Sequence, residues 1–222
     1  MKTISIAIDG PSGAGKSTIA KYIAKTMNIA YLDTGAMYRG LAYYALQNGI
    51  QPDDRDKVVP FLETVNMDIK YSENGQKVIV NGLDVTPYIR EHHISMAAST
   101  ISKIHEVRLK MCALQRIIAS KTDCVLDGRD IGSYVLPDAN VKIYMDASPE
   151  VRAERRKKDL EGKGDFSHTF EEILADIKAR DYQDMNRDFA PLKVADGAVV
   201  IDTSYMTIEE VANKVKEICK GK

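Results

Sequence analysis

The sequence predicts an α/β fold in which helices cover both faces of a mostly parallel sheet, with a small antiparallel insertion. Short apolar runs rich in β-branched residues alternate with segments of helical pattern, which is typical of a buried parallel sheet. A glycine-rich loop directly follows the first of these runs. Residues 66–86 instead alternate apolar and polar side chains around two Asn-Gly pairs, and this pattern favours hairpins with tight turns.

The parallel strands are predicted from short apolar runs that are bounded by glycine or aspartate. Ligands of such sheets bind beyond the carboxyl ends of the strands, so we expect a site where the runs end. The runs assigned to strands cover residues 3–9, 122–127, 141–146 and 198–202, and a further strand should end near Leu32.

The helix ends are predicted from capping residues. Ser148-Pro149 supplies a cap and a first-turn proline, and Thr169-x-x-Glu172 and Thr207-x-x-Glu210 match the capping-box pattern. Gly49 can take the left-handed conformation that ends a helix. Helices are expected over residues 17–27, 35–48, 102–119, 170–183 and 208–219, with another after Ser148 and a helical pattern resuming at about residue 86.

Composition narrows the class of protein. The 222 residues fit one domain, and 31 Lys plus Arg against 32 Asp plus Glu argue against a nucleic-acid or membrane-surface binder, which carries a basic excess. The three cysteines show no metal-ligand or disulfide spacing. No apolar stretch has the length of a membrane span, and the first one ends too early for a signal peptide. We therefore expect a cytoplasmic monomer with small-molecule partners.

The glycine-rich loop fits the pattern G-x-x-x-x-G-K-[ST] between a strand and a helix, which predicts binding of a nucleoside triphosphate. The glycines let backbone N–H groups approach phosphate oxygens, and the helix N-terminus adds positive charge. Lys16 is expected to reach the β- and γ-phosphates, and the Ser17 hydroxyl to ligate Mg²⁺. The predicted ATP-binding residues are Gly10, Pro11, Ser12, Gly13, Ala14, Gly15, Lys16, Ser17 and Thr18.

The class of P-loop protein follows from the other motifs. The chain has no D-x-x-G element and no N-K-x-D guanine reader, so a GTPase is disfavoured, and it is short for a motor. A small kinase remains, and an anionic acceptor needs arginines. Arginines occur in DTGAMYR, in DGRD, at 152, 155 and 156, and at 180 and 187. Taken singly, DGRD also fits a polar turn, and the arginines at 152–156 also fit a solvated helix face.

The motifs GPSGAGKST, LDTGAMYRG, VNG in the hairpin insertion, LDGRDIG and IKARDYQDMNRDFAPL together resemble the bacterial-type cytidylate kinases. This family of P-loop nucleoside monophosphate kinases is matched over nearly the whole chain. The resemblance implies a three-layer P-loop kinase fold, ATP and Mg²⁺ as cofactors, and transfer of the γ-phosphoryl group to CMP or dCMP. It also implies one kinase domain over residues 1–222, with a core (1–34, 98–150, 185–222), an acceptor-binding region (35–97) and a lid (151–168).

The resemblance assigns roles to single residues. Arg39 and Arg129 would hold the acceptor phosphate beside Thr34, and Arg155 would close over the phosphates during transfer. The catalytic residues it implies are Lys16, Arg129, Arg155 and Arg180. The substrate-binding residues are Asp33, Thr34, Arg39, Ser99, Arg108, Arg129, Asp130, Arg180, Asp184 and Arg187, of which Ser99, Arg108 and Arg187 address the cytosine ring and Arg180 and Asp184 the sugar.

Two alternatives to this function stay open at the level of sequence. One is a P-loop kinase for another small acceptor, such as UMP, AMP or shikimate. The other is a nucleotide-binding regulator that transfers nothing. No histidine lies in a motif, so the transfer is expected to depend on positioning and charge neutralisation rather than on a general base.

Overall fold

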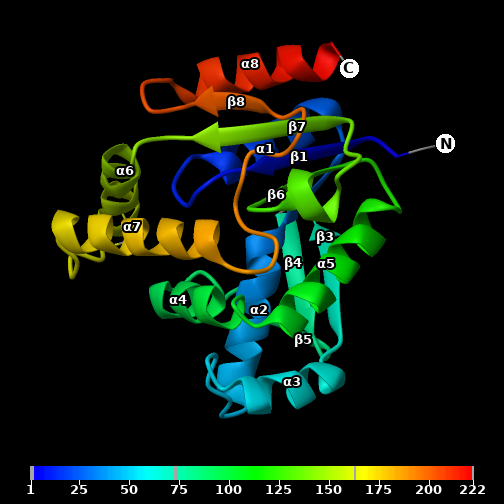
Figure 1. Ribbon diagram of the computed structural model, residues 1–222, viewed down its shortest axis with the longest axis vertical. Helices are drawn as coiled ribbons and strands as arrows, with labels where there is room; N and C mark the ends of the chain where they lie inside the picture. Colours follow the sequence, from blue (N-terminus) through cyan, green and yellow to red (C-terminus); the bar gives the residue numbers. More distant parts are fainter. Residues whose placement is uncertain (1–2, 73–74, 163, 222) are drawn as a thin grey trace. The chain divides into compact units, whose positions relative to one another are not determined.

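The computed structural model describes residues 3–72, 75–162 and 164–221, which form two compact units (Figure 1). The first unit comprises the described residues of 1–29 and 122–222, and the second unit residues 30–121. The predicted division into core, acceptor-binding region and lid concerns function and stays a prediction.

The first unit is built on parallel strands. Its elements are β1 (Ser5–Asp9), α1 (Lys16–Met27), β6 (Cys124–Gly128), the π-helix η1 (Ile131–Val135), β7 (Val141–Asp146), α6 (Pro149–Glu161), α7 (Phe170–Asn186), β8 (Val199–Asp202) and α8 (Ile208–Lys220). The sheet has the order β2-β6-β1-β7-β8, in which β2 (Ala30–Asp33) belongs to residues 30–121. β1 pairs in parallel with both β6 and β7, and β7 with β8.

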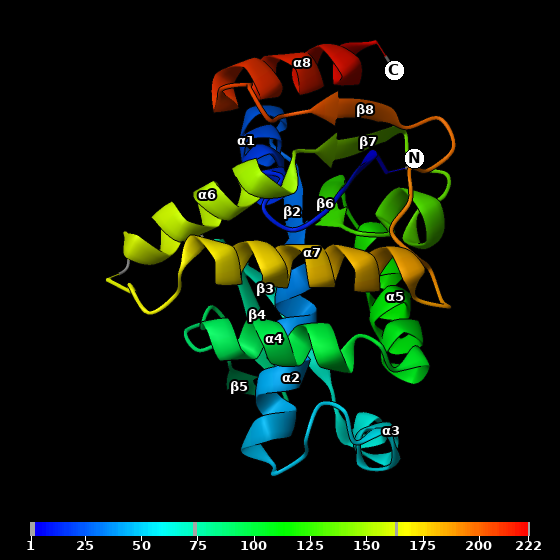
Figure 2. The same ribbon diagram turned by 60° about the vertical axis from the view of Figure 1, so that its left-hand side comes forward.

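Helices cover this sheet and also pack on one another. α1 packs on β6 and on α8, and α8 packs on β7. α6 and α7 form a pair whose buried interface holds Ala153 and Leu160 from α6 and Ile173 and Ile177 from α7 (Figure 2). Any movement of the predicted lid would therefore separate this apolar contact or carry both helices.

The second unit combines helices with an antiparallel sheet. Besides β2, its elements are α2 (Thr34–Gln47), α3 (Arg55–Thr64), β3 (Met67–Ser72), β4 (Gly75–Val80), β5 (Leu83–Asp84), α4 (His92–Ile101) and α5 (His105–Ala119). β3, β4 and β5 form the antiparallel insertion that the sequence predicts. α2 packs against β4, α4 and α5. Gly40 of α2 permits the close approach to β4, because a Cβ there would lie 2.7 Å from a Val78 methyl group.

Most of the predicted caps and turns are confirmed. Asn81 and Gly82 both have positive φ between β4 and β5, whereas Asn74 of the other Asn-Gly pair lies outside the described residues. Ser148 caps α6, and both predicted capping boxes are formed. Gly49 follows α2 with a φ of 72°.

Three local predictions need correction. Residues 50–65 have no predicted element but contain α3, which tolerates Pro60 because the proline is exposed and the carbonyl without a helical partner can bond to water. No helix begins at Thr86, since its hydroxyl accepts the Val78 N–H and so extends the sheet. The long helix begins at His105 rather than 102, and Ser102 ends α4 instead.

Within the described residues, no helix is both long enough and apolar enough to span a bilayer.

Candidate functional site

The glycine-rich loop has the conformation that an anion-binding loop requires. Gly10, Gly13 and Gly15 all have positive φ, a region that glycine enters without strain. A Cβ at Gly10 would lie 1.9 Å from the carbonyl oxygen of Met145 in β7, so no other residue fits there. The loop leads into α1, whose first residues are Lys16 and Ser17.

The pairing of β1 with β6 brings two predicted motifs to one edge of the sheet. Asp9 is in register with Gly128, so the glycine-rich loop and the DGRD segment both leave the sheet at the same level. The buried Asp9 carboxylate then accepts the N–H groups of Ile131 (2.8 Å) and Gly132 (2.7 Å) at the start of η1. Asp9 thereby fixes the segment that carries Arg129 and Asp130.

Ser17 faces a carboxylate that the sequence prediction does not include. Its hydroxyl donates to Asp127 at the end of β6 over 2.6 Å. In nucleotide sites, Mg²⁺ takes one or two protein oxygen ligands together with phosphate oxygens, and this donor pair fits such an ion. Among the residues described here, no group of three or more His, Cys, Asp and Glu side chains could hold a metal.

Lys16 is buried within the electrostatic influence of two arginines. Its ammonium group is buried and donates to the Pro11 carbonyl over 2.6 Å. Burial lowers the pKa of Lys16 well below its ordinary value, and the charges of Arg129 and Arg180 lower it further. A bound polyphosphate would neutralise this concentration of positive charge.

Asp184 links three of the predicted arginines. It accepts a hydrogen bond from Arg129 Nε over 2.9 Å and lies 3.6 Å from Arg187. Burial acts to raise the pKa of Asp184, but the charges of Arg129, Arg180 and Arg187 lower it below its ordinary value overall. Arg187 also lies 3.6 Å from Asp130 and donates through Nε to the carbonyl of Ala190 over 2.7 Å. The first unit thus brings together the predicted residues of DGRD and of α7.

In the second unit, Asp33 organises the start of α2. Its side chain accepts the Ala36 N–H (2.8 Å) as the helix cap and pairs with Arg39 (2.9 Å). A Cβ at Gly35 would lie 3.0 Å from Arg39 Nη1, so glycine leaves room for this pair. Thr34 is buried beside it at the first position of the helix.

The other two predicted residues of the second unit lie on helices that pack against α2. Arg108, on α5, is buried, and its guanidinium lies over the ring of Tyr38 at 5.7 Å. Ser99 is on α4, where its carbonyl accepts the Ser102 hydroxyl.

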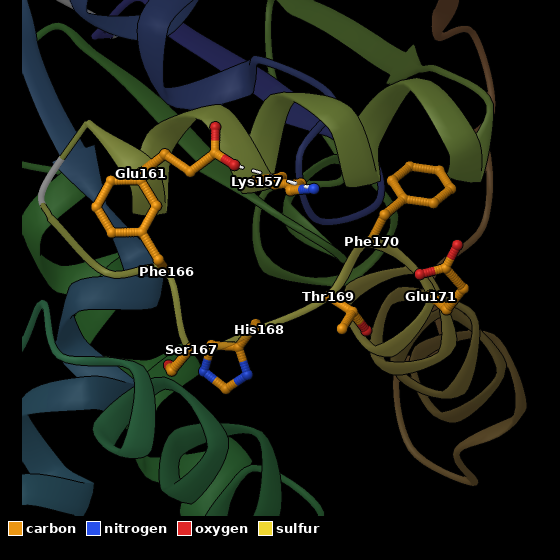
Figure 3. A pocket seen from close by; sticks show the side chains of 8 residues that line it. All are labelled: Lys157, Glu161, Phe166, Ser167, His168, Thr169, Phe170 and Glu171. Carbon is orange, nitrogen blue, oxygen red and sulfur yellow. Dashed lines mark ion pairs between the residues drawn. The ribbon is translucent and has the colours of Figure 1, made fainter.

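The predicted lid, residues 151–168, includes most of α6 and the segment that follows it. Arg155 donates to the carbonyl oxygen of Thr203 after β8 (2.6 Å), so it lies beside the loop that touches Ala14. Lys163, within the predicted lid, lies outside the described residues. A pocket lies beyond, between α6 and residues 166–171, where Lys157, Phe166 and His168 line it (Figure 3). Its lining residues include none of the predicted ATP-binding, catalytic or substrate-binding residues.

Comparison with known proteins decides the family. A model of the cytidylate kinase family matches residues 6–221. The chain belongs to this family. Cytidylate kinase of Clostridium botulinum is 47% identical over 220 residues, which cover 99% of each chain. That of Caldicellulosiruptor bescii is 47% identical over 98% of this chain and 96% of its own. Cytidylate kinase of Enterococcus faecalis is 46% identical over the full chain and 98% of its own.

A solved structure supports the fold alone. An uncharacterised protein from Eubacterium ventriosum aligns with a TM-score of 0.52 over 99% of this chain and 100% of its own, at 12% identity. The predicted fold class and family are thereby confirmed.

Sequence reasoning about this cytidylate kinase missed Asp9 and Asp127 as residues of the site. Both are the last aspartates of predicted strands whose carboxyl ends were the expected place for ligands, and this signal could have identified them. Arg152 was noted together with Arg155 and Arg156 but was assigned no role in the site. It is buried and paired with Asp181, so the alternative interpretation of residues 152–156 as a solvated helix face is wrong for this residue.

Asp9 gives the stability of the kinase a defined pH dependence. Burial raises the pKa of Asp9 to about 6, against the lowering effect of the two backbone N–H donors. The unfolded value is about 3.9, so this contribution to stability is complete below about pH 4 and is lost as the pH rises through 6. A difference of about two between the folded and unfolded pKa values corresponds to about 3 kcal/mol of unfolding free energy.

Asp9→Asn tests this assignment, because asparagine does not titrate. We expect the unfolding free energy of the wild type, minus that of Asp9→Asn, to fall by about 2–3 kcal/mol between pH 4 and 7. Urea denaturation at four pH values in that range measures it. A difference that stays flat with pH would show that Asp9 titrates alike in both states.

Proposed function

We propose that this protein transfers the γ-phosphoryl group of ATP to CMP or dCMP and releases ADP with CDP or dCDP. The observation that carries the proposal is the glycine-rich loop itself, with three glycines at positive φ and a buried Lys16 whose pKa is lowered by burial and by the charges of Arg129 and Arg180. These cations would face the terminal phosphate of a nucleotide held by that loop. Membership of the cytidylate kinase family supports the choice of acceptor.

On the donor side, the loop from Gly10 to Thr18 would hold the ATP phosphates by its N–H groups and by Lys16. Ser17 and Asp127 would hold the metal ion. Mg²⁺, when bound there with the nucleotide, would neutralise part of the phosphate charge. Lys16 would exchange its bond to the Pro11 carbonyl for one to a phosphate oxygen.

On the acceptor side, we propose that CMP is bound by the residues that the family resemblance assigns to it. Arg39 and Arg129 would bind its phosphate. Ser99, Arg108 and Arg187 would address the cytosine ring, supported by Asp130. Arg180 and Asp184 would reach the sugar, and Thr34 would donate to the nucleotide.

The chemistry assigned to these residues is positioning and charge neutralisation. The second pKa of a phosphate monoester is about 6, so the attacking oxygen of CMP is already anionic at neutral pH and needs no general base. Lys16, Arg129, Arg155 and Arg180 would stabilise the charge on the transferring group. Exclusion of water by closure would prevent hydrolysis of ATP.

A screen of acceptors tests the proposed function. Purified protein is mixed with ATP and Mg²⁺, and release of ADP is followed with CMP, dCMP, UMP, AMP or shikimate. We expect the highest kcat/KM with CMP and dCMP. Preference for another acceptor would identify a different P-loop kinase, and ATP consumption that ignores every acceptor would identify a regulator that transfers nothing.

Arg187→Met tests the base contact. The variant removes the charge near Asp130 and Asp184 but keeps the apolar stem, so we expect KM for CMP to rise about 10–100-fold while KM for ATP changes less than about threefold. Steady-state kinetics with each nucleotide varied in turn measures both values. Arg187→Lys, which keeps the charge without the planar fork, is the matched control and should recover part of the loss. Equal losses for CMP and ATP would remove the assignment.

A further inference from the structure

Arg152 is a buried cation of the first unit with hydrogen bonds to three other segments, and no step of the proposed transfer uses it. It is 2% exposed and forms a two-point ion pair with Asp181 of α7, with distances of 3.0 and 2.5 Å. Its Nε donates to the carbonyl of Ala147, just before α6. Nη1, which carries two N–H groups, also donates to the carbonyl oxygen of Ser12 in the glycine-rich loop over 3.1 Å.

The packing around this contact shows that the loop is shaped to receive it. A Cβ at Gly13 would lie 3.0 Å from the Cβ of Arg152, so only glycine lets the stem of Arg152 lie against the loop. Gly13 also has a φ of 82°, which disfavours other residues independently.

A second side chain holds a carbonyl two residues further along. The buried hydroxyl of Thr203, after β8, lies 3.2 Å from the carbonyl oxygen of Ala14 and 2.9 Å from that of Asp146. The Asp146 carbonyl already accepts the backbone N–H of Thr203 at 2.8 Å. Arg155 Nη1 donates to the same hydroxyl oxygen at 3.3 Å, so the single hydroxyl proton is available for a bifurcated hydrogen bond to the carbonyls of Ala14 and Asp146.

The geometry of the peptide bond determines where the neighbouring N–H groups point when these two carbonyl groups are held. In a trans peptide unit the C=O and the following N–H point in opposite directions. Where Arg152 holds the Ser12 carbonyl, the Gly13 N–H points away from Arg152. Where Thr203 holds the Ala14 carbonyl, the Gly15 N–H points away from Thr203. Both N–H groups belong to the loop that is expected to surround phosphate.

We propose that Arg152 and Thr203 are positioning residues that fix the Ser12–Gly13 and Ala14–Gly15 peptide planes, so that the Gly13 and Gly15 N–H groups face the donor phosphates before ATP binds. The inference rests on the proposed binding of ATP by this loop. Under this proposal, the orientation of the loop is set by side chains outside the glycine-rich motif, one on α6 and one in the segment after β8. Donors that are oriented beforehand cost no reorganisation when the ligand arrives.

The proposal is tested with Thr203→Val, which keeps the shape of the side chain and removes its hydroxyl, and with Thr203→Ser, which keeps the hydroxyl. Inorganic tripolyphosphate serves as a probe that contacts phosphate-binding groups alone. We expect its Kd and that of ATP to rise about tenfold in Thr203→Val, with KM for CMP unchanged, and to return close to the wild-type value in Thr203→Ser.

Amide proton shifts in ¹⁵N-labelled protein distinguish positioning from general stabilisation. In the wild type, tripolyphosphate should move the Gly13 and Gly15 amide protons downfield. Thr203→Val should reduce the shift of Gly15 and leave that of Gly13. Arg152→Lys, which keeps the charge beside Asp181 but loses the fork, should do the reverse, so each variant is the control for the other.

Three results separate the possible failures. A lower melting temperature with unchanged tripolyphosphate affinity in Thr203→Val would overturn the proposal and leave the residue a structural role only. Equal reduction of both glycine shifts in either variant would also overturn it, because each side chain is assigned to one peptide plane. A wild type that binds no tripolyphosphate would instead refute the proposed ATP site.

Discussion

Replacement of Lys16 by alanine is expected to lower kcat for phosphoryl transfer to CMP by about 10³-fold. The ammonium group is the cation of the glycine-rich loop. Burial and neighbouring positive charges destabilise its charged form, as the lowered pKa of Lys16 indicates, and a bound anion would stabilise that form. Release of ADP in a coupled assay measures the loss.

The fold should survive this change, because Lys16 gives up a poorly solvated charge rather than a packed apolar group. Its melting temperature is expected to equal or exceed that of the wild type. Lys21→Ala, on the exposed face of the same helix, is the matched control and should retain full activity. Turnover of Lys16→Ala within about tenfold of the wild type would refute the role of the loop in transfer.

Asp127→Asn is expected to lower kcat by about 10²-fold and to raise the Mg²⁺ concentration needed for half-maximal rate by at least about tenfold. Asparagine keeps an oxygen that can accept the Ser17 hydroxyl, so the 2.6 Å contact can persist while the negative charge is lost. A divalent ion bound between phosphate and protein depends on that charge.

A titration of the rate with Mg²⁺ at saturating ATP measures this effect. The control is Asp123→Asn. Asp123 lies just before β6, and its carboxylate accepts the Ile4 N–H over 2.7 Å. It should leave the Mg²⁺ dependence unchanged. The same Mg²⁺ dependence in Asp127→Asn and the wild type would exclude Asp127 from the metal site.

Much of the fold could be predicted because its signals are local. Caps at Ser148, Thr169 and Thr207 depend on residues three positions away, and the Asn81-Gly82 turn depends on two residues alone. The helix α3 was not predicted because a proline strongly disfavours a helix interior. The structure accommodates Pro60 within α3 because its position is exposed. The prediction of a helix from Thr86 was wrong because the hydroxyl of this residue accepts the N–H of Val78 in β4, a contact that the sequence does not show.

The same distinction separates the predicted and missed parts of the site. Lys16 and Ser17 belong to a contiguous motif, and the arginines follow from the family resemblance. Asp127 ends a predicted strand, but its contact with Ser17 follows from the three-dimensional structure, and so do the contacts of Arg152 with Ser12 and Asp181. These depend on which segments meet in space, and a single sequence does not state that.

The arginines of the proposed acceptor site arrive with their own counter-ions: Asp33 beside Arg39, and Asp184 beside Arg129 and Arg187. An isolated anion that approaches one of these arginines must share it with a carboxylate, so it gains little by binding. A ligand that engages several of them at once can outweigh that repulsion. Such an arrangement would favour a nucleotide over free phosphate at the proposed acceptor site.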